Sequence, residues 1–288
     1  MSISLRPPAD ADADACGRII YEAFKGIAER HNFRPDFSSA EFAIEFAHTL
    51  IAHPSVFGVV AEERGRVVGS NFLWEYNSIR GVGPITVAPD SQTRGTGCRL
   101  MEAVIERGRE ADGIRLVQDS FNIASLSLYA SLGFEVKEPL VLMEGHVKRA
   151  LPDGFEVRPL REEDLGDCSD LCRRVYGFDR TAELKATPPM LTSYVAVRDG
   201  RLTAYASAPH FWALNHAVAE TDEDMQALLA GVSAAATEYP LSLIVATRQA
   251  ALFRWCLAAG LRVVKPMTLM SMGQYQEPRG AYLPSVGY

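Results

Sequence analysis

The stretch Gln92–Gly97 limits the fold of this chain more than any other segment, because two glycines stand between an expected strand and an expected helix. The apolar run Ile85–Val87 predicts the strand, and helical spacing of apolar residues from Leu100 predicts the helix. Glycines let backbone N–H groups turn toward one point, and the first N–H groups of a helix lack partners within it. The loop therefore predicts a cradle for a phosphate or pyrophosphate.

The spacing of this loop separates it from two better-known phosphate loops. A P-loop requires Lys and then Ser or Thr after its last glycine, whereas Cys98-Arg99 follow here. A dinucleotide fingerprint requires three glycines and an acidic residue further on, and only two glycines are present. A nucleotide fold of either kind is therefore disfavoured.

Apolar periodicity in the first half predicts alternating helices and strands. The expected turn Glu63-Arg64-Gly65 joins two expected strands into a hairpin. Asn122 is an expected helix cap, and Gly133 the end of the same helix. Strands are expected near residues 5–7, 56–62, 67–74, 85–88, 114–119 and 136–143, and helices after Asp10, over 40–51, after the glycine loop and over 122–133.

The second half repeats several patterns of the first. Phe155–Leu160 resembles the segment around Arg6, and Pro266–Met270 repeats Pro139–Met143. A two-fold internal duplication with a shorter second copy accounts for both repeats. We therefore expect two domains, over residues 1–148 and 149–288, with a linker near 146–153.

Two segments carry a family resemblance. Val87–Gly97, with its Val-x-Pro strand end, resembles the acetyl-CoA-binding signature of the GNAT N-acetyltransferases, and Asn122–Phe134 resembles the second segment of that family. The resemblance covers residues 3–145 well and 155–272 only weakly. It implies an α/β (α+β) fold of two tandem GNAT-like domains, each a mixed, mostly antiparallel sheet flanked by helices.

The resemblance also implies acetyl-CoA as the cosubstrate, without a metal. The corresponding loop of the second half, Ala219–Asp224, has no glycine and four acidic residues, so we expect one cofactor site per chain, in the first half. By the resemblance, the residues that bind the cofactor are Val87, Gln92, Arg94, Gly95, Thr96, Gly97, Cys98 and Asn122.

Tyr129 is the expected general acid, since the resemblance places it where it would protonate the departing CoA thiolate. A phenol is a proton donor at neutral pH. For the general base, Gly83–Thr86 offers no carboxylate where many family members carry one. Glu75 and Asp119 are the candidates to replace it, and a structural or solvated carboxylate is the alternative for each.

The expected activity is transfer of an acetyl group to a primary amine of a small molecule or peptide, by direct attack in a ternary complex. A CoA-binding sensor or structural protein without turnover is the alternative. The second half is expected to shape the acceptor pocket or to mediate assembly, and a third hypothesis is that it serves chiefly in oligomerisation.

The composition of the chain disfavours two classes of partner. A net charge of −7 argues against a nucleic-acid partner, and the apolar runs are shorter than the roughly 20 residues that a membrane span needs. With no signal peptide recognised, the cytoplasm is the expected location. The five cysteines lack metal-ligand spacing, and Cys168 and Cys172 are expected to be buried. A homodimer is expected only on the general frequency of two-fold oligomers.

Overall fold

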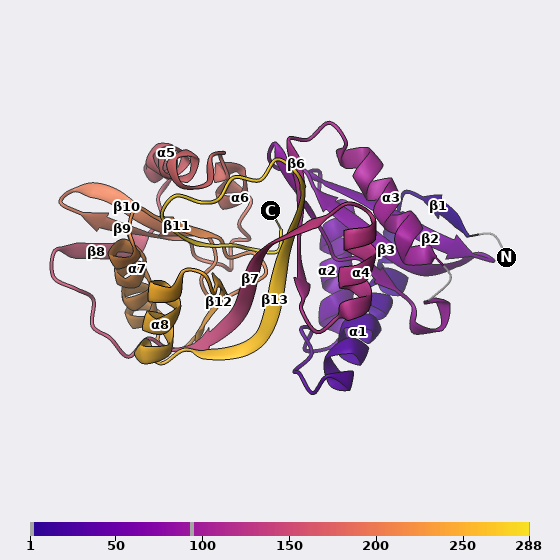
Figure 1. The fold of residues 1–288 in the computed structure, drawn as a ribbon, viewed down its shortest axis with the longest axis horizontal. Coiled ribbons are helices and arrows are strands. Elements are labelled where there is room, and N and C mark those ends of the chain that lie inside the picture. The colour runs from indigo at the N-terminus through magenta and orange to yellow at the C-terminus, as the bar shows by residue number, and fades with distance from the viewer. Residues whose placement is uncertain (1–2, 93–94, 288) are drawn as a thin grey trace.

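The computed structural model describes residues 3–92 and 95–287. Figure 1 shows two halves side by side, with the N-terminal half in indigo and magenta and the C-terminal half in orange and yellow. Long strands cross the middle and join the halves. The expected α/β architecture, with mostly antiparallel sheets flanked by helices, is confirmed.

The first half follows the expected order of elements, with one short strand in addition. That strand, β4 (Ile79–Val82), was not predicted, because its four residues include a glycine and an arginine and show no clear alternation. The other elements are β1 (Ser4–Arg6), α1 (Ala13–Arg30), α2 (Ala40–Ala52), β2 (Val56–Glu63), β3 (Arg66–Trp74), β5 (Thr86–Val87), α3 (Thr96–Gly108), β6 (Gly113–Asp119), α4 (Ile123–Ser131) and β7 (Glu135–Gly145).

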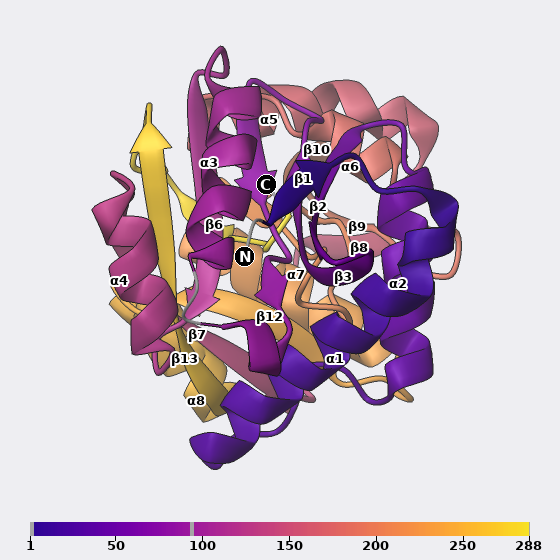
Figure 2. The ribbon, with the colours of Figure 1, turned by 90° about the vertical axis from the view of Figure 1, so that its right-hand side faces the viewer.

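Helices cover both faces of the first-half sheet. Successive side chains of a strand point to opposite faces, and β2 shows this directly. Val59 packs in the cluster that contains Leu100 of α3, whereas Val60 packs with Cys16 and Ile20 of α1. In Figure 2, α3 and α4 accordingly lie apart from α1 and α2.

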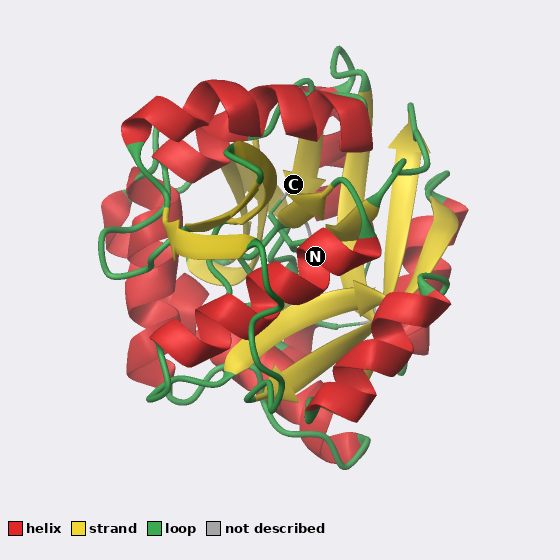
Figure 3. Cartoon of the chain, turned by 90° about the vertical axis from the view of Figure 1, so that its left-hand side faces the viewer, coloured by secondary structure: helices red, strands yellow, loops and turns green. Residues whose placement is uncertain are grey.

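The second half repeats this plan in a shorter form. Its second sheet is antiparallel throughout, and helices lie outside the strands in Figure 3. Its elements are β8 (Phe155–Pro159), α5 (Leu165–Tyr176), α6 (Thr181–Lys185), β9 (Tyr194–Arg198), β10 (Arg201–Ala206), β11 (Ala217–Ala219), α7 (Asp222–Ala235), β12 (Leu241–Ala246), α8 (Ala250–Ala259), β13 (Arg262–Gly273) and β14 (Ala281–Leu283).

An ion pair at the start of each half supports the duplication. Arg6 donates to both carboxylate oxygens of Asp12, at 2.6 and 2.9 Å. Arg158 donates to both oxygens of Asp164 in the same way, at 2.7 and 2.8 Å. Each aspartate also accepts a backbone N–H from three residues earlier, at 2.7 Å. The same local bonds therefore occur twice in one chain.

The halves exchange strands. β13, near the end of the chain, pairs with β6 on one side and with β7 on the other, so it lies inside the first-half sheet. β7 in turn pairs with β12 of the second half. The division at residues 148 and 149 remains a prediction about the sequence, and one continuous sheet crosses it.

Among the residues that the structure describes, no helix combines the length and the apolar character that crossing a membrane would require.

Candidate active site

The first-half sheet opens between β5 and β6. β4 pairs in parallel with β6 as far as Gly81 and Arg115, and the chain then passes through Gly83-Pro84, a cis peptide, to β5. Within the described ranges β5 pairs with β3 alone. The end of β6, Leu116–Asp119, therefore faces a gap on the β5 side.

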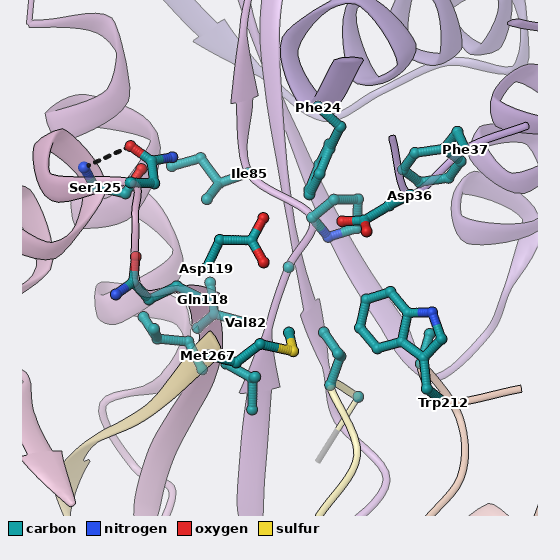
Figure 4. A pocket seen from close by; sticks show the side chains of 18 of the residues that line it. Phe24, Asp36, Phe37, Val82, Ile85, Gln118, Asp119, Ser125, Trp212 and Met267 are labelled. Atoms are coloured by element: carbon teal, nitrogen blue, oxygen red, sulfur yellow. Dashed lines mark hydrogen bonds between the residues drawn. The ribbon is translucent and has the colours of Figure 1, made fainter. Parts of the chain in front are cut away.

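A cavity of about 160 Å³ lies at this gap (Figure 4). One wall comes from the diverging strands and from α4, the other from α1, α2 and the loop between them. The second half completes the lining with residues 211–214 and 286–287 and with Lys265 and Met267 of β13. Both halves thus line the cavity, and the expected site residues Asp119, Asn122 and Tyr129 lie on the first-half side.

The α4 wall brings two expected residues together. The Asn122 side chain accepts a hydrogen bond from the Ser125 backbone N–H at 3.3 Å, which caps the helix. Tyr129 lies further along α4, lines the same cavity and is 6% exposed. Burial raises the pKa of Tyr129 to about 12, with a further contribution from the charge of Asp119. The phenol is therefore protonated at neutral pH, as a general acid requires.

Asp119 lies at the end of β6, and Figure 4 shows its carboxylate inside the cavity. Lys265 lies 2.6 Å from Asp119 Oδ1 and donates to both oxygens of Asp36, at 2.6 and 2.7 Å. Burial raises the pKa of Asp119, the charge of Lys265 opposes that rise, and the charge of Asp36 adds to it. A carboxylate with a raised pKa in a cleft is a better proton acceptor than a solvated one.

The glycine loop leads into α3 as expected. Gly95 is the N-cap, with φ +77°, a conformation that glycine adopts without strain. No described side chain caps this helix end. Thr96 is buried, and its hydroxyl has no hydrogen-bond partner among the described residues. Unpaired N–H groups and a buried orphan hydroxyl fit an anionic ligand such as a pyrophosphate.

The remaining cradle residues surround this helix end. Gln92 Nε2 donates to the Val87 carbonyl at 3.2 Å, which links the loop to β5. The Cys98 thiol donates to Glu102 at 3.5 Å, and burial together with that carboxylate raises its pKa, so the thiol is not activated as a nucleophile. Gly97 lies in the first turn of α3. Arg94, also expected in the cradle, lies outside the described residues.

The second-half counterpart of this helix end is already capped. Thr221 accepts a hydrogen bond from the Asp224 backbone N–H at 3.2 Å, and three acidic residues occupy the first turn of α7. Acidic side chains there would repel a phosphate. This contrast supports a single cradle per chain.

Glu75 does not join the other candidates. Arg107 binds both of its carboxylate oxygens, at 3.1 and 2.9 Å, and Arg80 lies 2.8 Å from one of them. Glu75 is absent from the described lining of the cavity. This arrangement favours a structural role, and its role as a base stays a prediction.

The sequence patterns did not indicate Asp36, Lys265 or Trp212 as site residues. The structure places Trp212 on the cavity, with Lys265 Nζ 5.0 Å from its ring centre. A lysine inside the apolar run 263–269 was the available signal, because buried lysines are almost always paired.

Comparison with known proteins agrees with the arrangement of the first half. Residues 21–134 match the sequence profile of the acetyltransferase (GNAT) family. No curated protein sequence is matched.

Solved structures match over nearly the whole chain. A protein from Pyrococcus horikoshii described as an acetyltransferase has a TM-score of 0.75 at 17% identity, over 99% of this chain and 96% of its own. A GCN5-related N-acetyltransferase from Sphaerobacter thermophilus gives 0.61 at 16%, over 97% and 98%. A tandem GNAT protein of the clavulanic acid biosynthesis pathway gives 0.59 at 14%, over 97% and 99%. These likenesses establish a shared fold.

Proposed function

Because residues 21–134 match the sequence profile of the acetyltransferase (GNAT) family, we propose that this protein is an N-acetyltransferase that uses acetyl-CoA and a primary amine of a small molecule or peptide. One observation carries the proposal. Asn122, Tyr129 and Asp119 line one cavity, at the place where β5 and β6 diverge. The proposed acid, the proposed base and Asn122, which caps α4, thus lie around one gap in the sheet.

The cradle residues would hold the cofactor. In this proposal the backbone N–H groups at the start of α3, from Gly95 to Cys98, bind the pyrophosphate, and Gln92 and Arg94, the latter outside the described residues, contribute to binding it. The backbone at Val87 and the side chain of Asn122 bind the pantetheine arm within the gap. Bound there, acetyl-CoA supplies an activated acetyl group as a thioester.

Two side chains would move protons. Asp119 accepts a proton from the attacking amine, directly or through water, because burial raises its pKa toward the range in which a carboxylate acts as a base. Tyr129 donates its hydroxyl proton to the leaving thiolate sulfur. Its raised pKa, about 12, keeps that proton available at neutral pH. The acetyl group passes directly from sulfur to nitrogen, and no cysteine of the chain is acylated.

A thiol-release assay tests the proposal. The protein is incubated with acetyl-CoA and a panel of amines, and free CoA thiol and acetylated amine are both measured. We expect stoichiometric formation of the two products with at least one amine. Equal thiol release with and without every amine would contradict an N-acetyltransferase.

The alternative is CoA binding without turnover. One observation favours it: Asp119 is already engaged by Lys265 at 2.6 Å, and an ion-paired carboxylate is a weaker base. Calorimetric binding of CoA together with no product from any amine would support this alternative.

A further inference from the structure

We propose that the acceptor is a monoamine with an apolar, ring-sized body, bound between the aromatic residues of both halves with its nitrogen at the Asp36–Lys265–Asp119 cluster. The inference rests on the proposed function and adds the class of acceptor to it. The lining of the cavity beyond the gap supplies the evidence.

Aromatic rings dominate the wall of the cavity opposite α4. They come from α1, α2 and the loop between them in the first half, and from the segment after β10 in the second half. Phe37 lies at the centre of the first-half group, with ring centres 5.4, 6.1 and 5.8 Å from Phe24, Phe42 and Phe46. Phe211 and Trp212 line the cavity from the second half. Such a surface favours an apolar ligand body.

The charges of the cavity fit one ammonium group. Its described lining holds two carboxylates, Asp36 and Asp119, and one ammonium, Lys265. With both carboxylates ionised, the formal charge is −2 + 1 = −1. One additional positive charge therefore neutralises the cluster, whereas a second would be buried without a partner.

Lys265 is not available as an anchor for an acceptor carboxylate. A lysine ammonium has three donors. Lys265 makes three close contacts, two to Asp36 and one to Asp119, and its side chain is 3% exposed. A carboxylate on the acceptor would meet two aspartates instead. Amino acids are therefore poor acceptors because they add a negative charge, and polyamines because they add more than one positive charge.

The test compares four amines at saturating acetyl-CoA: 2-phenylethylamine, hexylamine, phenylalanine and spermidine. Phenylalanine adds only a carboxylate to the first compound. We expect kcat/KM for 2-phenylethylamine and hexylamine to exceed that for phenylalanine and spermidine by about tenfold or more. Faster turnover of spermidine or phenylalanine would overturn the inference and leave the proposed function intact.

Binding can be followed without turnover. Two of the three tryptophans, Trp74 and Trp212, line the cavity, so 2-phenylethylamine should change the intrinsic fluorescence of the protein in the absence of acetyl-CoA. The variant Trp212→Ala should raise the Kd for this amine about tenfold and leave the Kd for CoA unchanged. Trp255→Ala, in the second half but outside the described lining, is the control.

Two results separate the two proposals. Saturable binding of 2-phenylethylamine with no turnover of any amine supports a binding site for an apolar monoamine and contradicts the proposed enzyme activity. If octanoyl-CoA is used at least as well as acetyl-CoA and the preference among amines is absent, the aromatic wall holds the acyl chain, and the inference is wrong.

Discussion

The ammonium of Lys265 lies 2.6 Å from the carboxylate of Asp119, so a strand of the second half supplies the charge that faces the candidate base of the first. This contact follows from the position of β13, which places Met267 opposite Asp119 in the sheet. Four predictions follow from the site around it.

Replacing Lys265 by methionine should destabilise the fold and raise the pKa of Asp119 further. The change leaves Asp36 and Asp119 buried without their shared cation, which typically costs about 3–5 kcal/mol. Chemical denaturation should show this loss. Since Lys265 opposes the rise in the pKa of Asp119, any residual activity should need a higher pH. Lys185→Met, at an exposed position, is the control. An unchanged denaturation midpoint would show that the cluster is not a buried ion pair in solution.

Replacing Tyr129 by phenylalanine should lower kcat by about 10² or more, the usual contribution of a general acid. The ring stays in its place, so the Kd for CoA should change little. The raised pKa of the phenol, about 12, also predicts that Tyr129 causes no alkaline fall of the rate below about pH 11. Tyr239→Phe, 61% exposed, is the matched control. A Tyr129→Phe enzyme with full turnover would remove the acid role.

Replacing Asp119 by asparagine should change the pH profile. A carboxylate accepts a proton only when it is ionised, so the rate should increase with pH through the pKa of Asp119. Burial raises that pKa, and the midpoint should therefore lie above the usual range of an aspartate. In the Asn variant, turnover should fall about 10²-fold and this acid limb should disappear. Asp153→Asn, at an exposed position, should leave both unchanged. Retention of the limb in the Asp119 variant would assign it to another group.

Replacing Gly95 by alanine should weaken cofactor binding. Gly95 has φ +77°, where an alanine costs about 1 kcal/mol, and no atom of the described residues lies within 4 Å of the added methyl group. Gly65, in the β2–β3 turn, has φ +76° and equal space around it. Both variants should lose similar stability, and only Gly95→Ala should raise the Kd for CoA in calorimetry. Equal CoA affinities would argue against a cradle at α3.

Local patterns in the sequence were sufficient for most elements. Apolar spacing and turn residues located α1 to α4, and the glycine pair located the start of α3 at Thr96. The repeat of Arg6 by Arg158 anticipated the duplication, which the two equivalent aspartate pairs now support. These features depend on residues close together in the chain, which is where sequence patterns are informative.

Features that depend on distant segments were not predictable in this way. Pro139–Met143 and Pro266–Met270 are similar apolar runs, and either could pair with β6 on pattern alone. The observed neighbour of β6 is β13. The exchange of strands between the halves was not predicted, so the ion pair between Lys265 and Asp36 was not predicted either. The net charge of the cavity could therefore not be derived from the sequence.

The insertion of β13 between β6 and β7 also limits how the two halves can be separated by gene recombination. A gene fragment that encodes only the first half would specify two strands whose common neighbour is missing, and a cavity without its lysine. Recombination at the linker would therefore yield a first half with an open sheet edge and an incomplete cavity. The second half lacks the glycine loop of the first, yet its strand β13 completes the sheet and the cavity of the first.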